Sequence, residues 1–427
     1  MAENLEKNNR ERRVLGSESV DSEKSFENNW QRPLHVDVGI VIVSVIMLAF
    51  GLVMLFSASM SYSLIESNTG TSYLIRQMLA TSLGFFFMIA LSKFSMKIFD
   101  HPIFATFVYM FSLILLVLTL FSAPQNGARR WLTIPVFGTF QPSEFTKVVI
   151  VYTIAVYQSW LIKQRAQGKF EREAGIRGAI KDAFLDILLP LLLVAMPVAI
   201  MSLQTHMSGI MIILLISFAS LLAAGIPTRS WLTASFILII IVAALALILV
   251  SIWSSLPESI TGRFGHVFTR LEIFSDSETV SPDKVYQINQ GLISLGSGGW
   301  FGVGLGRGKQ KHKYLPEVHN DYIFSSIVEE LGFVGGMFVL GLFIIFLILG
   351  YRVAYRSSSV YAQIVATGIS SLVTLQAVLN VAVNVIAIPP TGISLPFFSY
   401  GGTSNLFFLI GVGLLLNVSK FGVRDAT

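Results

Sequence analysis

The sequence predicts an all-α integral membrane protein, a polytopic bundle of about ten transmembrane helices with a large extracytoplasmic loop between spans seven and eight. Three observations lead to this prediction. Hydrophobic residues make up 53% of the chain and charged residues only 13%, whereas a soluble domain carries roughly 25% charged residues. Ten apolar runs are each long enough to cross the ~30 Å hydrocarbon core as a helix. The positive charges between these runs gather on one side of the predicted membrane.

The ten runs follow one another through short connections, apart from one long gap after the seventh. The eighth run is longer than a bilayer requires, so we expect it to tilt or to project past the interface. The expected spans lie at residues 36–58, 73–92, 103–122, 143–162, 184–203, 207–225, 230–253, 321–350, 359–384 and 402–419.

The positions of lysine and arginine predict that both termini are cytoplasmic. In that orientation 19 of the 30 Lys and Arg residues fall on the inner side, and most of the others lie in one long outer loop that such counts discount. Residues 1–35 are polar without an apolar period, which predicts a disordered cytoplasmic tail, and 421–427 form the cytoplasmic C-terminus. Between them, 36–420 is the transmembrane domain, with 254–320 as its outer loop. The basic loop 163–183 is expected to form a short surface helix.

Composition excludes several kinds of site. The chain has no cysteine, so disulfides and thiolate metal sites are excluded. The net charge of +5 indicates sidedness in a membrane protein and not nucleic-acid binding. The glycine-rich run 296–308 contains no G-x-G-x-x-G window and follows no predicted strand, so we expect tight turns at the membrane surface and not a nucleotide site.

Residues 126–131 place two adjacent arginines, Arg129 and Arg130, on the outer side, against the trend of the other positive charges. One interpretation is interfacial anchoring, with Trp131 in the aromatic belt and both arginines reaching to the headgroups. The other is recognition of an anionic headgroup, because guanidinium forks match phosphate oxygens. We favour the second and name all three as candidate substrate-binding residues.

The fourth span opens with Pro142, which suits the first helical position, and with Glu144, where the helix dipole favours an anion. Glu144 and Lys147 share a helical face and can pair, and structural pairing alone would explain both. Lysine inside a span is rare, however, and an equally weighted alternative has Lys147 facing a cavity and binding a phosphate. Both are therefore candidate substrate-binding residues.

Glu317, His319 and Asp321 lie within five residues at the outer rim of the eighth span. Ionisable groups at membrane depth usually mark a functional site. Asn320 or Asp321 could simply cap the helix, but three ionisable residues are more than a cap requires. We expect Asp321 to carry the chemistry and Glu317 and His319 to bind substrate.

Further polar residues lie inside the eighth and ninth spans. Glu329 and Glu330 are expected to make buried polar contacts between helices. Asn380 and Asn384 share one face of the ninth span, for which hydrogen bonding between helices is the default interpretation.

Residues 388–402, rich in proline and glycine, cannot form a regular helix. Irregular backbone at membrane depth is tolerated only where it lines a cavity or is buried in protein. We therefore expect this segment, which includes the candidate substrate-binding residue Ser399, to face one outward-opening cavity together with Asp321.

These motifs together resemble the SEDS family, the membrane proteins of bacterial shape, elongation, division and sporulation. The resemblance extends over nearly all of residues 36–420, and its motifs occur in the family's order. They are Leu55-Phe56-Ser57-Ala58-Ser59, Gly127-Ala128-Arg129-Arg130-Trp131, Gln141-Pro142-Ser143-Glu144-Phe145, the segment 314–324, Glu329-Glu330-Leu331-Gly332 and residues 395–402.

Within the family, residues 310–317 look more like the FtsW division branch and its sporulation relative SpoVE than like RodA. Two positions depart from the family pattern. Many members carry Pro-Asp-Leu-Gly where this chain has residues 205–209, so no acidic role can be transferred there. Threonine is usual in place of Asn320, a change that we expect to spare the neighbouring aspartate.

The resemblance implies a peptidoglycan glycosyltransferase that polymerises lipid II, an undecaprenyl-pyrophosphate disaccharide-peptide, at the outer face of the bacterial cytoplasmic membrane during division or sporulation. The family's essential aspartate corresponds to Asp321. Family members act with a class B penicillin-binding protein, which crosslinks the new strands, and with other divisome proteins. Family members also use divalent cations, which suggests Mg²⁺ or Mn²⁺ as a cofactor, although the sequence shows no clear metal cluster.

The bond made by that reaction suggests a mechanism. An α-linked sugar pyrophosphate that becomes a β-1,4 glycan is inverted in one displacement, which requires one general base and positive charge on the leaving group. Asp321 is the expected base, with a pKa raised by partial burial. Arg129, Arg130 and Lys147 are candidates for the pyrophosphate.

Two alternatives remain open. Ten spans, intramembrane charges and a cavity with broken helices would also suit a lipid II flippase. Such a transporter should carry cavity-facing charges from both leaflets, whereas the informative charges here cluster on the outer side. The third interpretation is a non-catalytic scaffold for a penicillin-binding protein, in which Asp321 is only structural.

Overall fold

The computed structural model describes residues 36–124, 128–134, 138–252, 282–312, 314–389 and 391–420. The predicted cytoplasmic tails, 1–35 and 421–427, and a large part of the predicted outer loop 254–320 lie outside the described residues. The helices are α2 (Val38–Ser67), α3 (Ser72–Lys93), α4 (Met96–Phe99), α5 (Pro102–Leu120), α6 (Pro142–Ala166), α7 (Gly175–Ala183), the π-helical turn η1 (Phe184–Leu188), α8 (Leu189–Leu203), α9 (Met207–Ala223), α10 (Thr228–Ile252), α12 (Pro282–Ser297), α13 (Ile323–Arg356), α14 (Val360–Asn384) and α15 (Gly402–Ser419).

The membrane bundle agrees with the predicted all-α architecture. Within the described residues, nine helical segments are long and apolar enough to cross a membrane, and α9 is a shorter apolar helix in the position of the predicted sixth span. The ends differ in places, because α2 continues to Ser67 and α13 to Arg356. One feature was not predicted: β1 (Leu132–Ile134) and β2 (Gly138–Phe140) form a short antiparallel hairpin between α5 and α6.

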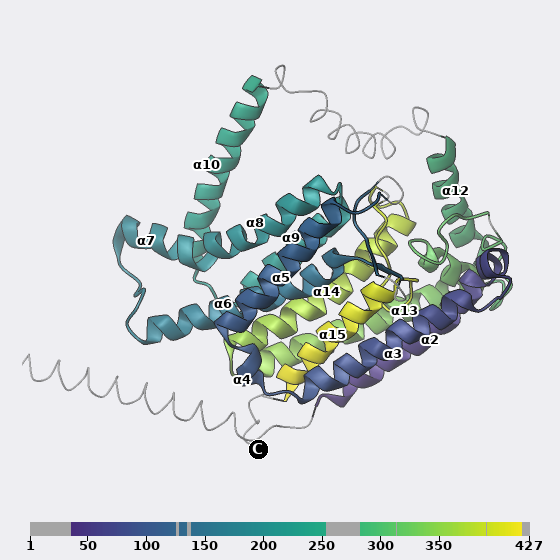
Figure 1. The fold of residues 1–427 in the computed structure, drawn as a ribbon, viewed down its shortest axis with the longest axis horizontal. Coiled ribbons are helices and arrows are strands. Elements are labelled where there is room, and N and C mark those ends of the chain that lie inside the picture. The colour runs from purple at the N-terminus through teal and green to yellow at the C-terminus, as the bar shows by residue number, and fades with distance from the viewer. Residues whose placement is uncertain are drawn as a thin grey trace, which may run out of the picture.

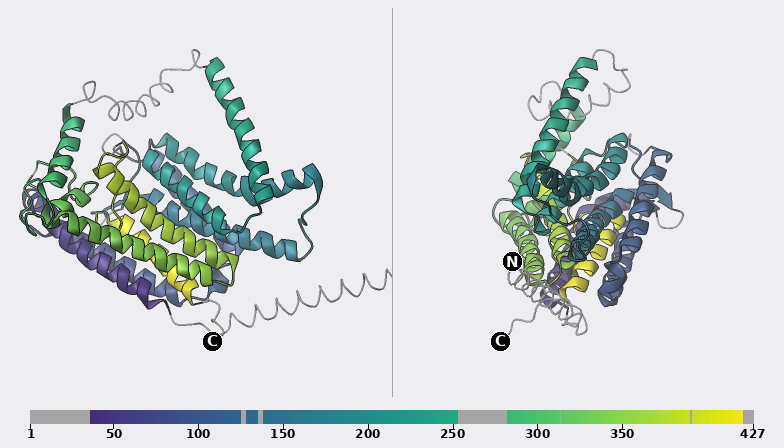
Figure 2. Two further views of the ribbon diagram at one scale, coloured as in Figure 1. Left: turned by 180° about the vertical axis from the view of Figure 1, so that it is seen from behind. Right: turned by 90° about the vertical axis from the view of Figure 1, so that its left-hand side faces the viewer.

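The core of the bundle is formed by α6, α14 and α15. In their most apolar windows 78%, 72% and 72% of the residues are buried, against 6% for α10. Figures 1 and 2 show α10 leaning away from the bundle, while α14 is surrounded by neighbouring helices. Because so little of α10 is buried, its position depends on its contacts with α7 and η1.

Helix ends follow local sequence signals. The Asp37 carboxylate accepts a hydrogen bond from the Ile40 amide and caps α2, and Ser359 caps α14 by accepting from the Ala362 amide. Pro142 is placed in the first turn of α6, where its missing N–H costs nothing.

The glycine-rich run of the predicted outer loop packs its backbone against a break in α13. Gly332 interrupts that helix with φ 74°, a conformation that favours glycine. The amides of Val303 and Gly304 donate to the carbonyl oxygens of Glu329 and Glu330, both at 3.0 Å. The predicted tight turns are therefore present, and they depend on close approach of two backbones.

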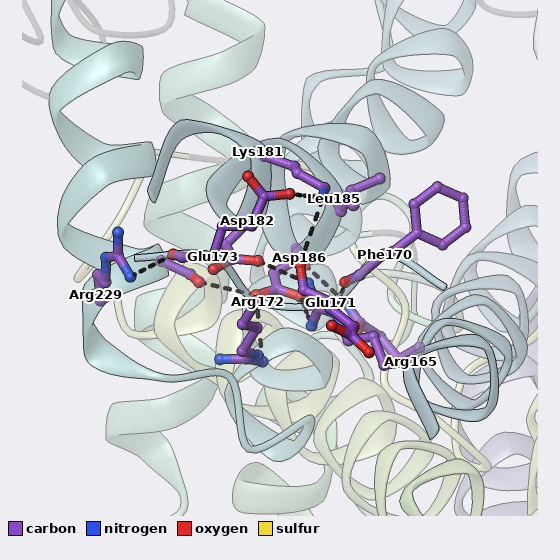
Figure 3. Close-up of polar contacts among 12 residues, drawn as sticks. Arg165, Phe170, Glu171, Arg172, Glu173, Lys181, Asp182, Leu185, Asp186 and Arg229 are labelled. Carbon is purple, nitrogen blue, oxygen red and sulfur yellow. Dashed lines mark hydrogen bonds and ion pairs between the residues drawn. The ribbon is translucent and has the colours of Figure 1, made fainter. Parts of the chain in front are cut away.

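The opposite end of the bundle from α12 carries a cluster of ion pairs around η1 (Figure 3). The buried Asp186 carboxylate accepts from Arg165 Nη1 at 2.6 Å and from the Ser230 hydroxyl at 2.8 Å. Arg165 also pairs with buried Asp182 at 3.2 Å. We call this the Asp186 end of the molecule, and the end where α12 leads into α13 the Asp321 end.

The π-helical turn has a local cause. Pro190 has no N–H to donate to the preceding turn, and the carbonyl oxygens of Leu185 and Asp186 accept instead from Tyr157 and Gln158 of α6, both at 2.7 Å. As a result α7, η1 and α8 run on as one helical segment, Gly175–Leu203, so the predicted surface helix at 163–183 is continuous with the fifth span.

Candidate active site at the start of helix α13

Asp321 precedes α13 and does not cap it. Tyr322 occupies the N-cap position and makes no side-chain cap bond, so capping does not explain the aspartate. Among the described residues, no hydrogen bond or ion pair of the standard lengths is made by the Asp321 carboxylate. Its oxygen Oδ2 lies close to Gly392, where an added Cβ would approach it to 3.2 Å. Asp321 therefore lies next to the irregular segment 388–402, while the outward-opening cavity that we expected the two to share stays a prediction.

The surroundings of Asp321 favour its protonated form. Burial, and then the negative charge of Glu317, raise the pKa of Asp321 from 3.8 to about 7, while Arg130 opposes this shift. A carboxylate of this kind is ionised in a substantial fraction of molecules at neutral pH and is still basic enough to accept a proton.

The backbone at Asp321 is held by two asparagines. The amides of Asn380 and Asn384 both donate to the Asp321 carbonyl oxygen at 2.9 Å, and Asn384 Oδ1 accepts from the Ser325 hydroxyl at 2.7 Å. Their hydrogen bonding between helices was predicted from their shared face. The sequence did not indicate that these asparagines bind the backbone of Asp321, because this contact depends on how α14 packs against α13.

Ser399 also supports this backbone. Its hydroxyl donates to the Asn320 carbonyl oxygen at 2.6 Å and accepts from the Leu395 amide at 2.7 Å. The side chain is buried. Its predicted contact with substrate is untested, and the two bonds assign it a structural task.

Arg130 lies beside the site and is held by the turn between α8 and α9. Its Nη2 donates to the Thr205 carbonyl oxygen at 2.6 Å and its Nε donates to the Gln204 carbonyl oxygen at 3.4 Å. Its positive charge lowers the pKa of Asp321. Trp131 is partly buried next to it.

Arg129 borders an open pocket of about 580 Å³. It is exposed, and its Nη1 donates to the Leu120 carbonyl oxygen at 3.0 Å. The pocket combines this cation with apolar walls and main chain, and its lining residues are Leu120, Pro124, Ala128, Arg129, Leu203, Gln204 and Thr205. Such a lining suits a molecule with an anionic group next to a hydrocarbon chain.

Glu144 and Lys147 form the predicted ion pair, with Nζ to Oε2 at 2.7 Å. Lys147 Nζ also donates to Gln376 Oε1 at 2.6 Å and is 1% exposed. Both side chains are buried between α6 and α14, so the geometry favours the structural pairing over a phosphate contact. Substrate binding by either residue has no support from these contacts.

Glu317 and His319 are placed differently from each other. Glu317 is exposed with a positive φ of 54°, so it is accessible beside Asp321. The His319 ring is buried and packs on Tyr62, Tyr73 and Tyr400, with ring centroids 5.1, 4.8 and 5.9 Å away. The histidine therefore belongs to an aromatic cluster with these three tyrosines.

A divalent cation is the cofactor that the resemblance suggests for this site. Among the described residues there is no group of three or more His, Cys, Asp or Glu side chains that could hold a metal. Glu317 and Asp321 offer two carboxylates, and Mg²⁺ is usually held by one or two carboxylates together with substrate phosphates and water, so a cation here would need the substrate as a further ligand. We therefore assign no step to a metal.

Comparison with known proteins gives matches over most of the chain. The family model described as cell cycle protein, FtsW/RodA/SpoVE, matches residues 38–423. A probable peptidoglycan glycosyltransferase FtsW of Coxiella burnetii is 32% identical over 90% of this chain and 96% of that protein. Stage V sporulation protein E of Bacillus subtilis is 31% identical over 90% of this chain and 97% of its own length.

Solved structures show the same fold. A chain of a peptidoglycan synthase complex that coordinates polymerization and crosslinking is similar with a TM-score of 0.67 at 25% identity, covering 91% of this chain and 99% of that one. The rod shape determining protein RodA of Thermus thermophilus gives a TM-score of 0.60, also at 25% identity, over 91% of this chain and 98% of RodA. With a family model that matches nearly the whole membrane domain, the chain belongs to the SEDS family of FtsW, RodA and SpoVE proteins.

Proposed function

We propose that this protein polymerises lipid II into β-1,4 glycan strands at the outer face of the bacterial cytoplasmic membrane, in division or sporulation, with Asp321 as general base. The observation that carries the proposal is a carboxylate whose pKa is raised to about 7 and which has no structural bond among the described residues. Relatives named peptidoglycan glycosyltransferases, 32% identical over 90% of the chain, support the reaction class.

The chemistry is one inverting displacement. The 4-hydroxyl of the acceptor sugar attacks the anomeric carbon of the donor, and a carbon–oxygen bond forms on the face opposite the pyrophosphate. Asp321 takes the hydroxyl proton as this bond forms. The bond from the anomeric carbon to the pyrophosphate breaks, and its electrons leave on the lipid pyrophosphate. One base and one stabilised leaving group are sufficient for this step.

Arg130 and Arg129 are the proposed partners of the pyrophosphate. Arg130 is held in place by two carbonyl oxygens, so its fork is oriented before the substrate arrives, as electrostatic stabilisation requires. Arg129 borders the pocket with apolar walls, which suits the start of the lipid chain. Trp131 and the accessible Glu317 complete the proposed substrate-binding surface, while His319 and Ser399 have structural roles next to Asp321 and Glu144 and Lys147 form a buried pair.

The proposal includes a partner. A polymerase leaves its strands uncrosslinked, and a similar chain belongs to a peptidoglycan synthase complex that coordinates polymerization and crosslinking. We propose a class B penicillin-binding protein as the partner, with both termini of this chain cytoplasmic and Asp321 on the outer side of the membrane.

The test is lipid II polymerisation by the purified protein with its cognate penicillin-binding protein, transpeptidation blocked, comparing wild type with Asp321→Ala. Glycan ladders that vanish in a folded variant support both the reaction and the base. Ladders from both proteins leave the enzyme and remove Asp321 as its base. Absence of ladders from the wild-type complex contradicts the polymerase, and headgroup flipping by the same protein in vesicles would then indicate a flippase.

A further inference from the structure

Two adjacent glutamates of α13 follow the candidate active site along the chain and are not used in the proposed chemistry. Glu329 and Glu330 are 2% and 0% exposed. Buried carboxylates cost free energy unless they are paired and hydrogen-bonded. Their partners therefore show what the fold gains from keeping them.

Glu330 joins three parts of the Asp321 end. Its carboxylate accepts from Lys311 Nζ at 2.7 Å, from the Ser57 hydroxyl of α2 at 2.7 Å and from the Gly306 amide at 2.9 Å. Lys311 Nζ also donates to the Ser57 hydroxyl at 2.9 Å. Lys311 is 4% exposed, so the ion pair is shielded from water and from screening by salt.

Glu329 binds the same loop, which carries Gly306 and Lys311 and connects α12 to α13. Its Oε1 accepts from the amides of Lys309 and Gln310 at 2.7 and 3.2 Å, and its Oε2 accepts from the Ser294 hydroxyl of α12 at 3.1 Å. Gly308 lies against both carboxylates, since an added Cβ there would meet Glu330 Oε1 at 3.0 Å and Glu329 Oε2 at 3.2 Å. Both carboxylates of α13 therefore contribute to the position of residues 306–311.

Residues 314–322, which we call the Asp321 segment, begin immediately after this loop. The Leu315 amide donates to the Gln310 carbonyl oxygen at 2.9 Å, and the Tyr62 hydroxyl donates to the Leu315 carbonyl oxygen at 3.1 Å. The far end of the segment is held by Asn380 and Asn384 at the Asp321 carbonyl oxygen. The segment is therefore held at its start by a backbone bond and the partly buried Tyr62, and at its end by two buried asparagines.

We propose that Glu330, through its buried ion pair with Lys311, is a positioning residue that fixes the start of the Asp321 segment and so places Asp321 for catalysis. The inference rests on the proposed function, because only a reacting Asp321 requires such placement. Glu330 touches no substrate in this arrangement. It acts through Lys311 and the backbone, and a displacement of the reacting group by about 1 Å is enough to cost rate.

The chain offers a matched control at the Asp186 end. Asp186 is 1% exposed and, like Glu330, accepts from a cation and a serine hydroxyl, those of Arg165 and Ser230, and it also pairs with the more exposed Arg172 at 3.5 Å. Replacing either carboxylate by its amide removes a charge of the same kind from a buried pair. Only Glu330 is connected to the Asp321 segment.

The experiment compares Glu330→Gln with Asp186→Asn in the full-length protein, with its penicillin-binding partner, at a temperature where both variants are folded. We expect Glu330→Gln to lower kcat for polymerisation about tenfold or more and to change KM for lipid II by less than about twofold. Hydrogen exchange of peptides covering 309–322 should rise in Glu330→Gln. Asp186→Asn should change neither kcat nor that exchange.

Three results would overturn the inference. One is a folded Glu330→Gln with unchanged exchange in 309–322 and wild-type kcat. Another is an equal loss of kcat in Asp186→Asn, which would assign the effect to general stability. If Glu330→Gln does not fold, Ser57→Ala removes one donor more gently, with an expected loss of about threefold in kcat, and no change in either measurement would be the third contradiction.

The exchange measurement separates this inference from the proposed function. If the wild-type complex forms no glycan while Glu330→Gln still raises exchange in 309–322, the polymerase is wrong and the positioning of the segment stands. If polymerisation is normal in wild type and Glu330→Gln alike, the polymerase stands and the positioning role is wrong.

Discussion

The Asp321 end and the Asp186 end both bury carboxylates, but they use them differently. Asp186 and Asp182 pair directly with Arg165, and Ser230 joins α10 to the same cluster. At the Asp321 end, Glu329 and Glu330 accept from loop amides and Lys311, while Asp321 itself has no such bond among the described residues. Charges that only hold helices together are satisfied, whereas the charge proposed to react is left unsatisfied.

This difference has a physical reason. A satisfied carboxylate is stabilised in its ionised form and is a weak base, while an unsatisfied and partly buried one has a raised pKa and can accept a proton. The fold is therefore less stable with an ionised Asp321 than with a satisfied carboxylate there, and this carboxylate is more reactive as a base. The predictions below test that contrast.

The largest effect is expected for Asp321→Asn, which should lower kcat for polymerisation at least about 100-fold. The folded pKa of about 7 lies above the usual 3.8. The fold thus favours the protonated form, and this contribution is present below the usual value and lost as pH rises through about 7. At pH 8 the variant should melt no lower than wild type. Glycan ladders measure the loss of kcat, and thermal melts at pH 8 measure the stability. A lower melting temperature for the variant would contradict the view that the Asp321 carboxylate is unsatisfied in the fold.

Arg130→Met should lower kcat by about 30- to 100-fold, because it removes an oriented donor from the developing pyrophosphate charge. Arg129→Met is the matched control. Arg129 is exposed and bonded to one carbonyl oxygen, so we expect mainly a higher KM for lipid II. Initial rates over a range of lipid II concentrations separate the two, and identical profiles would show that the two arginines act in the same way.

The pH profile of kcat/KM should fall by about tenfold per pH unit below about 7, because Asp321 must be ionised to act as a base. Glu317→Gln removes a charge that raises the pKa of Asp321, so the midpoint should move to lower pH. Arg130→Met removes a charge that lowers it, so the midpoint should move to higher pH. Shifts in the same direction would indicate that the profile reports another group.

The smallest effect on activity is expected at the other end. Asp186→Asn should keep kcat within about twofold, while the melting temperature falls because Arg165 keeps only Asp182 as a buried partner and loses its ion pair at 2.6 Å. Differential scanning of the purified protein measures the loss. A variant with wild-type stability would show that this cluster contributes little to the fold.

Several features of the site could be predicted locally. The Glu144–Lys147 pair followed from a spacing of three residues in one helix, and it is present at 2.7 Å. The absence of helix in 388–402 followed from its prolines and glycines, and the described residues between α14 and α15 form none. The possible cap at Asn320 or Asp321 was wrong, because the helix begins only after Tyr322.

Other features could not be predicted, because they depend on which helices become neighbours. The sequence left open whether Lys147 meets a phosphate, and the approach of α14 brings Gln376 to its ammonium instead. His319 was a candidate for substrate binding, yet the ends of α2 and α3 surround it with Tyr62 and Tyr73.

The apolar runs, the SEDS motifs and the choice of Asp321 came from the sequence, because apolar length and residue order are properties of the chain alone; among the described residues nine of the ten predicted spans are long enough to cross a membrane, and α9 is shorter. The tertiary structure decided what surrounds that aspartate. Lys311 and Glu330 are close in sequence, but Ser57, 273 residues from Glu330, completes their network. Asn384 reaches Asp321 across 63 residues. Such contacts form only when separate helices pack, so their geometry is not contained in any local pattern.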